Sequence, residues 1–187
     1  MELDPEENLE KLKRDMITFL TGDLSERIGR LCAEVLNRLP AEWDAYRTFD
    51  FLESEEVKYP GGKDTGRVIY GTARREEEGE TFPAELPGGE EPEQVWGVTL
   101  YIDPLCWLSD SAACWVIARA LAHIASGLRT GSGVIGKVPI TQTQPGQYEP
   151  APPKDRHEDA ADTIAMNWGF TKELQAFLSE TEGDNFG

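Results

Sequence analysis

The sequence VIARALAHIASG, residues 116–127, is apolar on almost every side of a helix and yet contains one arginine and one histidine. Arg119 and His123 are four residues apart, so in a helix they lie on the same face. Small and apolar residues occupy the remaining positions, which predicts that this helix is buried in the core. Because an unpaired guanidinium in a core is strongly destabilising, the sequence predicts a carboxylate opposite Arg119.

The best source of that carboxylate is the sequence HEDAAD at residues 157–162. Glu158 and Asp162 are also four residues apart, and they lie on a second predicted helix (residues 156–169) whose other face is apolar. Each of the two helices carries two polar residues, four positions apart, on an apolar face. We expect these polar pairs to contact each other where the helices pack together. We therefore expect Arg119 to pair with Glu158, and His123 with Asp162.

Two strands are predicted before the buried helix. Residues 66–75 (GRVIYGTARR) and 94–103 (QVWGVTLYID) are rich in β-branched and aromatic residues, and antiparallel pairing is the simplest way to join them. Between them, residues 76–93 are acidic and contain several glycines and prolines, which predicts a solvated loop. Ser109 or Ser111 is expected to cap the start of the buried helix, and Gly127 to end it.

Further helices are predicted toward both ends of the chain. Apolar residues at helical spacing predict helices over residues 5–20 and 23–39, and residues 41–52 are expected to add a short helical turn. Residues 128–155 are rich in glycine and proline and predict a long loop. A last short helix is predicted over residues 172–180, capped by Thr171.

The order of these elements predicts a single α+β domain that spans residues 1–187. The N-terminal helices occupy residues 1–50, the core residues 66–170, and a C-terminal helix and tail residues 171–187. The sheet is expected to be small and mostly antiparallel.

The order of the predicted elements resembles that of the small zincin-like metallopeptidases of the gluzincin type. This order is a strand, a buried helix, a long loop and a helix with Glu158 and Asp162. These enzymes carry an HExxH zinc motif on a buried helix and a downstream ExxxD segment. His123 matches the second zinc-binding histidine, Glu158 the third ligand, and Asp162 the acid beside the ligands. The resemblance covers roughly residues 67–170 and implies a zincin-like fold with a substrate cleft along residues 95–103.

Two departures from that motif concern its chemistry. Arg119 stands where the first zinc-binding histidine should be, and Ala120 stands where the catalytic glutamate should be. Zinc hydrolysis requires three protein ligands and a base for the metal-bound water, and an arginine stays protonated in proteins. The resemblance therefore implies a catalytically inactive protein with a vestigial site made of Arg119, Ala120, His123, Glu158 and Asp162, and without a resident cofactor.

The same resemblance implies a peptide- or protein-binding role, in which an extended peptide adds to the strand at residues 95–103. One alternative is an enzyme with a relocated zinc site, for which the ligands would be His123, Glu158 and His157. A second alternative is an acidic protein-interaction or inhibitor module whose function lies in the loop at residues 76–93. The sequence does not indicate an oligomeric state.

The charge of the chain excludes some partners. With 35 acidic and 18 basic residues, the formal net charge is -17. Such a chain repels nucleic-acid phosphates and anionic membranes, so neither is an expected partner. No apolar run reaches the ~18 residues of a membrane span, and the N-terminus is acidic and polar, so we expect a cytoplasmic protein. Cys32 and Cys114 fall on apolar helical faces and are expected to be small core residues.

Overall fold

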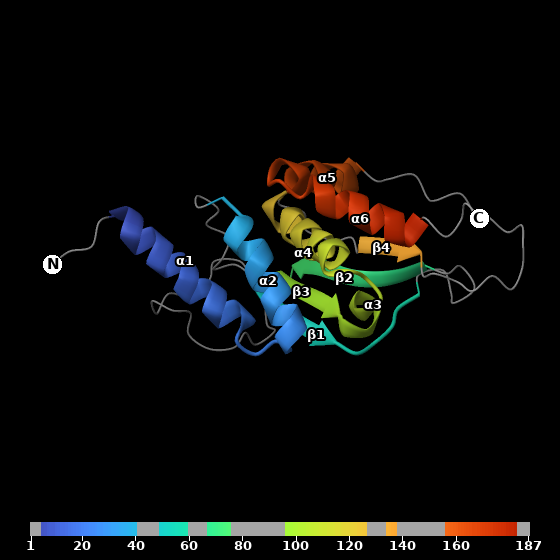
Figure 1. Cartoon of the computed structure of the whole chain (residues 1–187), viewed down its shortest axis with the longest axis horizontal. Coiled ribbons are helices and arrows are strands. Elements are labelled where there is room, and N and C mark those ends of the chain that lie inside the picture. The colour runs from blue at the N-terminus through green and yellow to red at the C-terminus, as the bar shows by residue number, and fades with distance from the viewer. Residues whose placement is uncertain are drawn as a thin grey trace, which may run out of the picture.

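The computed structural model describes residues 5–40, 49–59, 67–75, 96–126, 134–137 and 156–182. At residues 75, 134–137, 156–159 and 182 it describes the backbone. Within these ranges the chain forms helices and one mixed sheet, so the α+β class predicted from the sequence is confirmed. Helix α4 lies across the sheet, with α2 on one side and α5 and α6 on the other (Figure 1).

The sheet has four described strands in the order β1-β3-β2-β4. Their bounds are β1 Phe49–Ser54, β2 Arg67–Arg75, β3 Trp96–Tyr101 and β4 Val134–Lys137. The predicted antiparallel pairing of β2 with β3 is confirmed, with Ala73 opposite Val98. Strand β4 is also antiparallel to β2, whereas β1 runs parallel to β3.

The position of β3 within the sheet contradicts the expectation that an extended peptide adds to the strand at residues 95–103. β3 is paired with β1 on one side and with β2 on the other, so both of its backbone edges are occupied. An added strand needs a free edge, so an extended peptide cannot join the sheet at β3.

Strand β1 corrects the helical turn expected over residues 41–52. Residues 49–52 are in a strand, and residues 41–48 lie outside the described part of the chain. Phe49 and Phe51 are both buried, and their rings meet edge to face with centroids 5.2 Å apart. Residues two apart lie on the same side of a strand but on different sides of a helix, so this aromatic pair favours the strand.

Strand β4 lies within the predicted loop at residues 128–155, so that prediction is wrong for Val134–Lys137. Four residues are too few to show a period, and β4 depends on pairing with the edge of β2. The predicted strand at residues 94–103 also extends too far. Ile102 and Asp103 instead begin α3, where Pro104 is tolerated because the first turn of a helix leaves its N–H groups unpaired.

Apart from the turn expected at residues 41–52, the structure has a helix at each place where the sequence predicts one. Their bounds are α1 Pro5–Thr21, α2 Glu26–Arg38, α3 Ile102–Cys106, α4 Asp110–Ala125, α5 Arg156–Asn167 and α6 Thr171–Glu182. Ser109 caps α4, as predicted, by accepting a hydrogen bond from the N–H of Ala112 at 3.2 Å. Gly169 joins α5 to α6 with φ at 93°, a left-handed conformation that favours glycine.

Helix α4 is the centre of the core, which is one continuous apolar cluster. Gly71 on β2 allows α4 to lie close to the sheet, because a Cβ atom at this position would come within 3.0 Å of Cγ1 of Val116. The apolar faces of α1 and α2 and buried residues of α5 and α6 complete the same cluster, including Leu31, Ala161 and Phe177. None of the described helices is long and apolar enough to cross a membrane.

Candidate functional site

The candidate site lies where α4 meets α5. Nε of Arg119 donates a hydrogen bond to Oδ1 of Asp162 over 2.5 Å, and the two groups form an ion pair. Arg119 is 6% exposed and Asp162 is 7% exposed. The pair is therefore largely removed from water, where both the attraction between the charges and the cost of desolvating them are large.

One partner of Arg119 is Asp162, which we expected to pair with His123. A carboxylate of α5 does lie opposite Arg119, as the sequence predicts, but it belongs to Asp162, whereas we expected Glu158. The side chain of Glu158 lies outside the described side chains, and so does its expected contact with Arg119. Ala161 and Ala165 are fully buried beside Asp162, and their small size allows α5 to approach α4 closely enough for the short aspartate to reach the guanidinium.

His123 lies one turn after Arg119 and is fully buried, at 0% exposed. It is seven residues after Val116, and seven residues are close to two helical turns, so His123 lies on the same side of α4 as Val116, which faces the sheet. Asp162, its expected partner, accepts the hydrogen bond of Arg119 through Oδ1, and the pairing of His123 with Asp162 stays a prediction. The fixed charge of Arg119 thus lies on the same helix face as the imidazole, one turn away.

Ala120 follows Arg119 on α4 and is buried in the core. Its methyl group cannot accept or donate a proton, so this position supplies no base for a water molecule. The structure therefore brings Arg119 and Asp162 together at the contact between α4 and α5, and it places Ala120 and His123 in the core on the same helix as Arg119.

No group of three or more histidine, cysteine, aspartate or glutamate side chains that could hold a metal ion occurs among the described residues. The backbone places His157 and Glu158 in the first turn of α5, but the site expected from them and His123 lies outside the described side chains. The ion pair of Arg119 with Asp162 is a polar link that joins α4 to α5 at this level.

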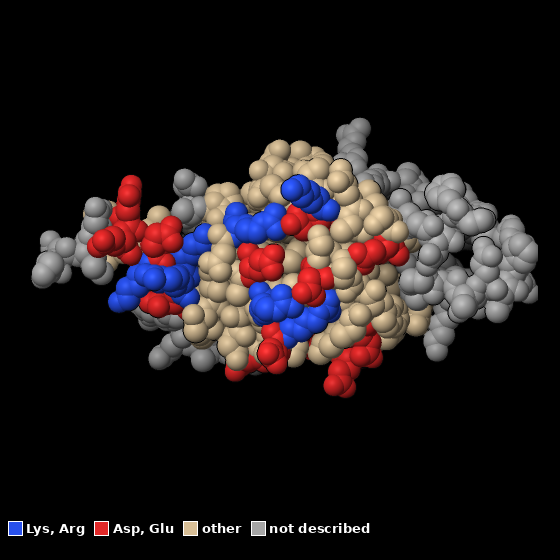
Figure 2. Space-filling model, in the orientation of Figure 1, with Lys and Arg blue, Asp and Glu red and all other residues tan. Residues whose placement is uncertain are grey.

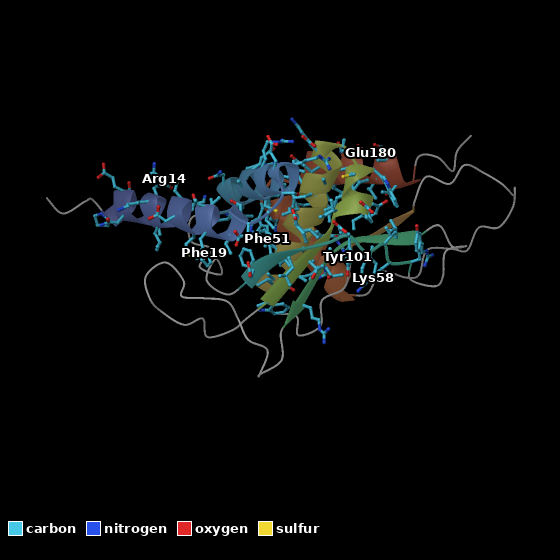
Figure 3. All side chains as sticks on the ribbon, turned by 90° about the horizontal axis from the view of Figure 1, so that it is seen from below. Arg14, Phe19, Phe51, Lys58, Tyr101 and Glu180 are labelled. Carbon is cyan, nitrogen blue, oxygen red and sulfur yellow. The ribbon has the colours of Figure 1, made fainter. Side chains whose placement is uncertain are left out.

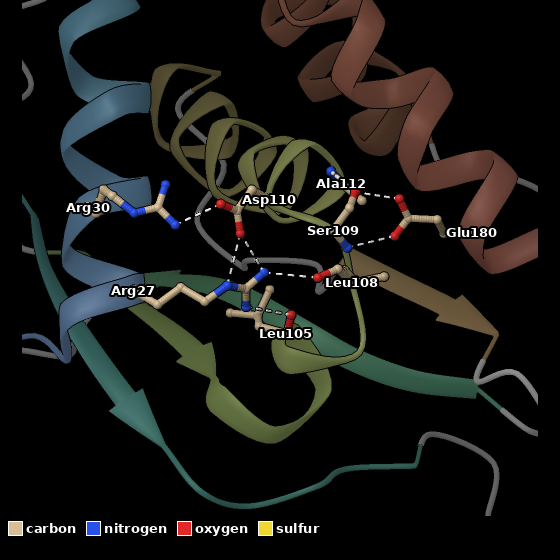
Figure 4. Close-up of polar contacts among 8 residues, drawn as sticks. All are labelled: Arg27, Arg30, Leu105, Leu108, Ser109, Asp110, Ala112 and Glu180. Atoms are coloured by element: carbon tan, nitrogen blue, oxygen red, sulfur yellow. Dashed lines mark hydrogen bonds and ion pairs between the residues drawn. The ribbon is translucent and has the colours of Figure 1, made fainter.

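A second polar cluster, which the sequence did not predict, surrounds the N-terminal end of α4 (Figure 4). Asp110 accepts hydrogen bonds from Nε of Arg27 at 3.0 Å and from Nη2 of Arg30 at 2.7 Å. Arg27 also donates to the carbonyl oxygens of Leu105 and Leu108. These contacts tie α4 to α2. The partners are about 80 residues apart in the sequence, so no local pattern could have revealed them.

Helix α6 holds the same end of α4 from the other side. The backbone N–H of Ser109 donates to Oε2 of Glu180 at 2.8 Å, and its hydroxyl donates to Oε1 of the same carboxylate. A carboxylate at a helix N-terminus is stabilised by the unpaired N–H groups and by the helix dipole. The end of α4 away from His123 is therefore fixed between α2 and α6.

The buried cysteines do not add a nucleophile to this site. Cys32 and Cys114 are buried, as the sequence predicts, and burial raises the pKa of both thiols, to about 12 for Cys114. A thiol with so high a pKa is not ionised near neutral pH, and the thiolate is the reactive form.

Charged side chains on one face of the molecule are mixed rather than segregated. On the face shown in Figure 2, lysine and arginine side chains lie beside aspartate and glutamate side chains over α1 and around α2. This face therefore presents no broad basic surface of the kind that binds nucleic acid.

Comparison of the chain with known proteins finds no match to a family model, to a curated protein or to a solved structure.

Proposed function

We propose that the protein is a catalytically inactive, metallopeptidase-like protein of the cytoplasm in which the ion pair of Arg119 and Asp162 replaces a metal ion as the link between α4 and α5. Its role is to bind a peptide or protein partner. The observation that supports this proposal is the buried contact between Nε of Arg119 and Oδ1 of Asp162.

The chemistry of the two substituted positions supports the absence of catalysis. The guanidinium of Arg119 stays protonated and would repel a zinc ion held by His123 one turn away. Ala120 supplies no base to activate water. Each substitution by itself removes a requirement of metal-assisted hydrolysis, and together they leave a packed contact between two helices.

The architecture supports the rest of the proposal at a coarser level. A buried helix that lies across a small mixed sheet and then packs against a following helix is the arrangement that the resemblance implies. With β3 enclosed between β1 and β2, partner binding must use surfaces other than the edges of that strand.

The test of the vestigial site is the variant Arg119→His. This change removes the fixed charge and restores the missing type of ligand, so we expect the purified variant to bind zinc in a one-to-one ratio by elemental analysis. Arg38→His is the matched control, because Arg38 lies on α2 and contacts Glu173 and Gly169, away from the α4–α5 contact. A folded Arg119→His variant that takes up no more zinc than the control would contradict the proposal.

A deletion separates the binding role from the acidic-module alternative. Removal of residues 76–93 leaves partner binding intact if the folded core supplies the binding surface. Loss of all binding in this deletion, with the thermal unfolding midpoint unchanged, would assign the function to the acidic loop instead.

A further inference from the structure

We draw no further inference here: the strongest candidate, the apolar face of α1 on which Leu9, Leu12 and Phe19 are exposed (Phe19 is labelled in Figure 3), carries none because nothing in the described part of the chain shows what covers it.

Discussion

Arg119 shows how one residue can decide between two kinds of site. A histidine at this position would be a candidate metal ligand, whereas the arginine carries a permanent charge and requires a carboxylate. The structure supplies that carboxylate from Asp162, at 2.5 Å and in a buried position. The identity of the residue thus determines whether the two helices can be held by a metal ion or by an ion pair.

Replacement of Arg119 by methionine tests the contribution of this pair to stability. Arg119→Met leaves Asp162 buried without its partner, and we expect the free energy of unfolding to fall by ~3 kcal/mol or more. Arg30→Met is the control, because its ion pair with Asp110 is exposed, and it is expected to cost less than about 1 kcal/mol. Urea unfolding measures both. A loss of less than ~0.5 kcal/mol for Arg119→Met would show that the pair does not hold the helices together.

Gly71 allows a second test at the scale of single residues. A Cβ atom in Gly71→Ala would lie 3.0 Å from Cγ1 of Val116, so we expect α4 to be displaced and the stability to fall by ~1–3 kcal/mol. The same change should cost less in a Val116→Ala background, where the opposing methyl groups are absent. A double-mutant cycle by urea unfolding measures the difference. Equal costs in both backgrounds would place the strain elsewhere.

The contacts that hold the start of α4 depend on the charge of Asp110, so their contribution to stability changes with pH. A hydrogen bond from Arg30 holds the pKa of Asp110 below its ordinary value, against a smaller opposing effect of desolvation. A lowered pKa in the folded state means that the stabilisation is present above the unfolded pKa of about 4 and is lost as the pH falls through the folded value.

We therefore expect the thermal midpoint of the wild type to fall more steeply below about pH 4 than that of Asp110→Asn, which has no carboxylate to protonate at this position. Thermal unfolding followed by circular dichroism between neutral and acidic pH measures the two profiles. Parallel profiles for the two proteins would show that the contacts of Asp110 with Arg27 and Arg30 contribute nothing to the fixation of α4.

The elements also show which parts of the fold a sequence can predict. Helix α4, the first two helices and the pairing of β2 with β3 follow from hydrophobic periodicity and from caps such as Ser109, which are local signals. Strand β4 is short and depends on its pairing with β2, and β1 is marked only by the spacing of Phe49 and Phe51. Neither has a period long enough to recognise. These strands are determined by tertiary contacts.

The candidate site also has features that the sequence predicts and features that only the fold reveals. The four-residue spacing of Arg119 and His123 predicts the polar face of α4, and Asp162 belongs to the segment in which a carboxylate was expected. The choice of Asp162 as the partner of Arg119 depends on how closely α5 approaches α4, which a single sequence does not encode locally. The contacts of Asp110 and Glu180 at the other end of α4 join residues far apart in the chain, and only the fold reveals them.

At the scale of the whole molecule, the candidate site lies inside the fold, where Arg119 is 6% exposed and Asp162 is 7% exposed. The contact between α4 and α5 is internal, and in the proposed function its ion pair takes the place of a metal ion between the two helices. Large apolar side chains also remain exposed on the outside of the molecule, among them Leu9, Leu52 and Trp107.

The zinc content of the wild-type protein tests the central claim most directly. The chain is purified in the presence of added zinc, passed through a desalting column, and analysed for metal and protein in the same sample. If the ion pair of Arg119 and Asp162 has replaced the metal, zinc will remain far below one ion per chain. One tightly held zinc ion per chain would contradict the claim and would show that α4 and α5 still form a metal site.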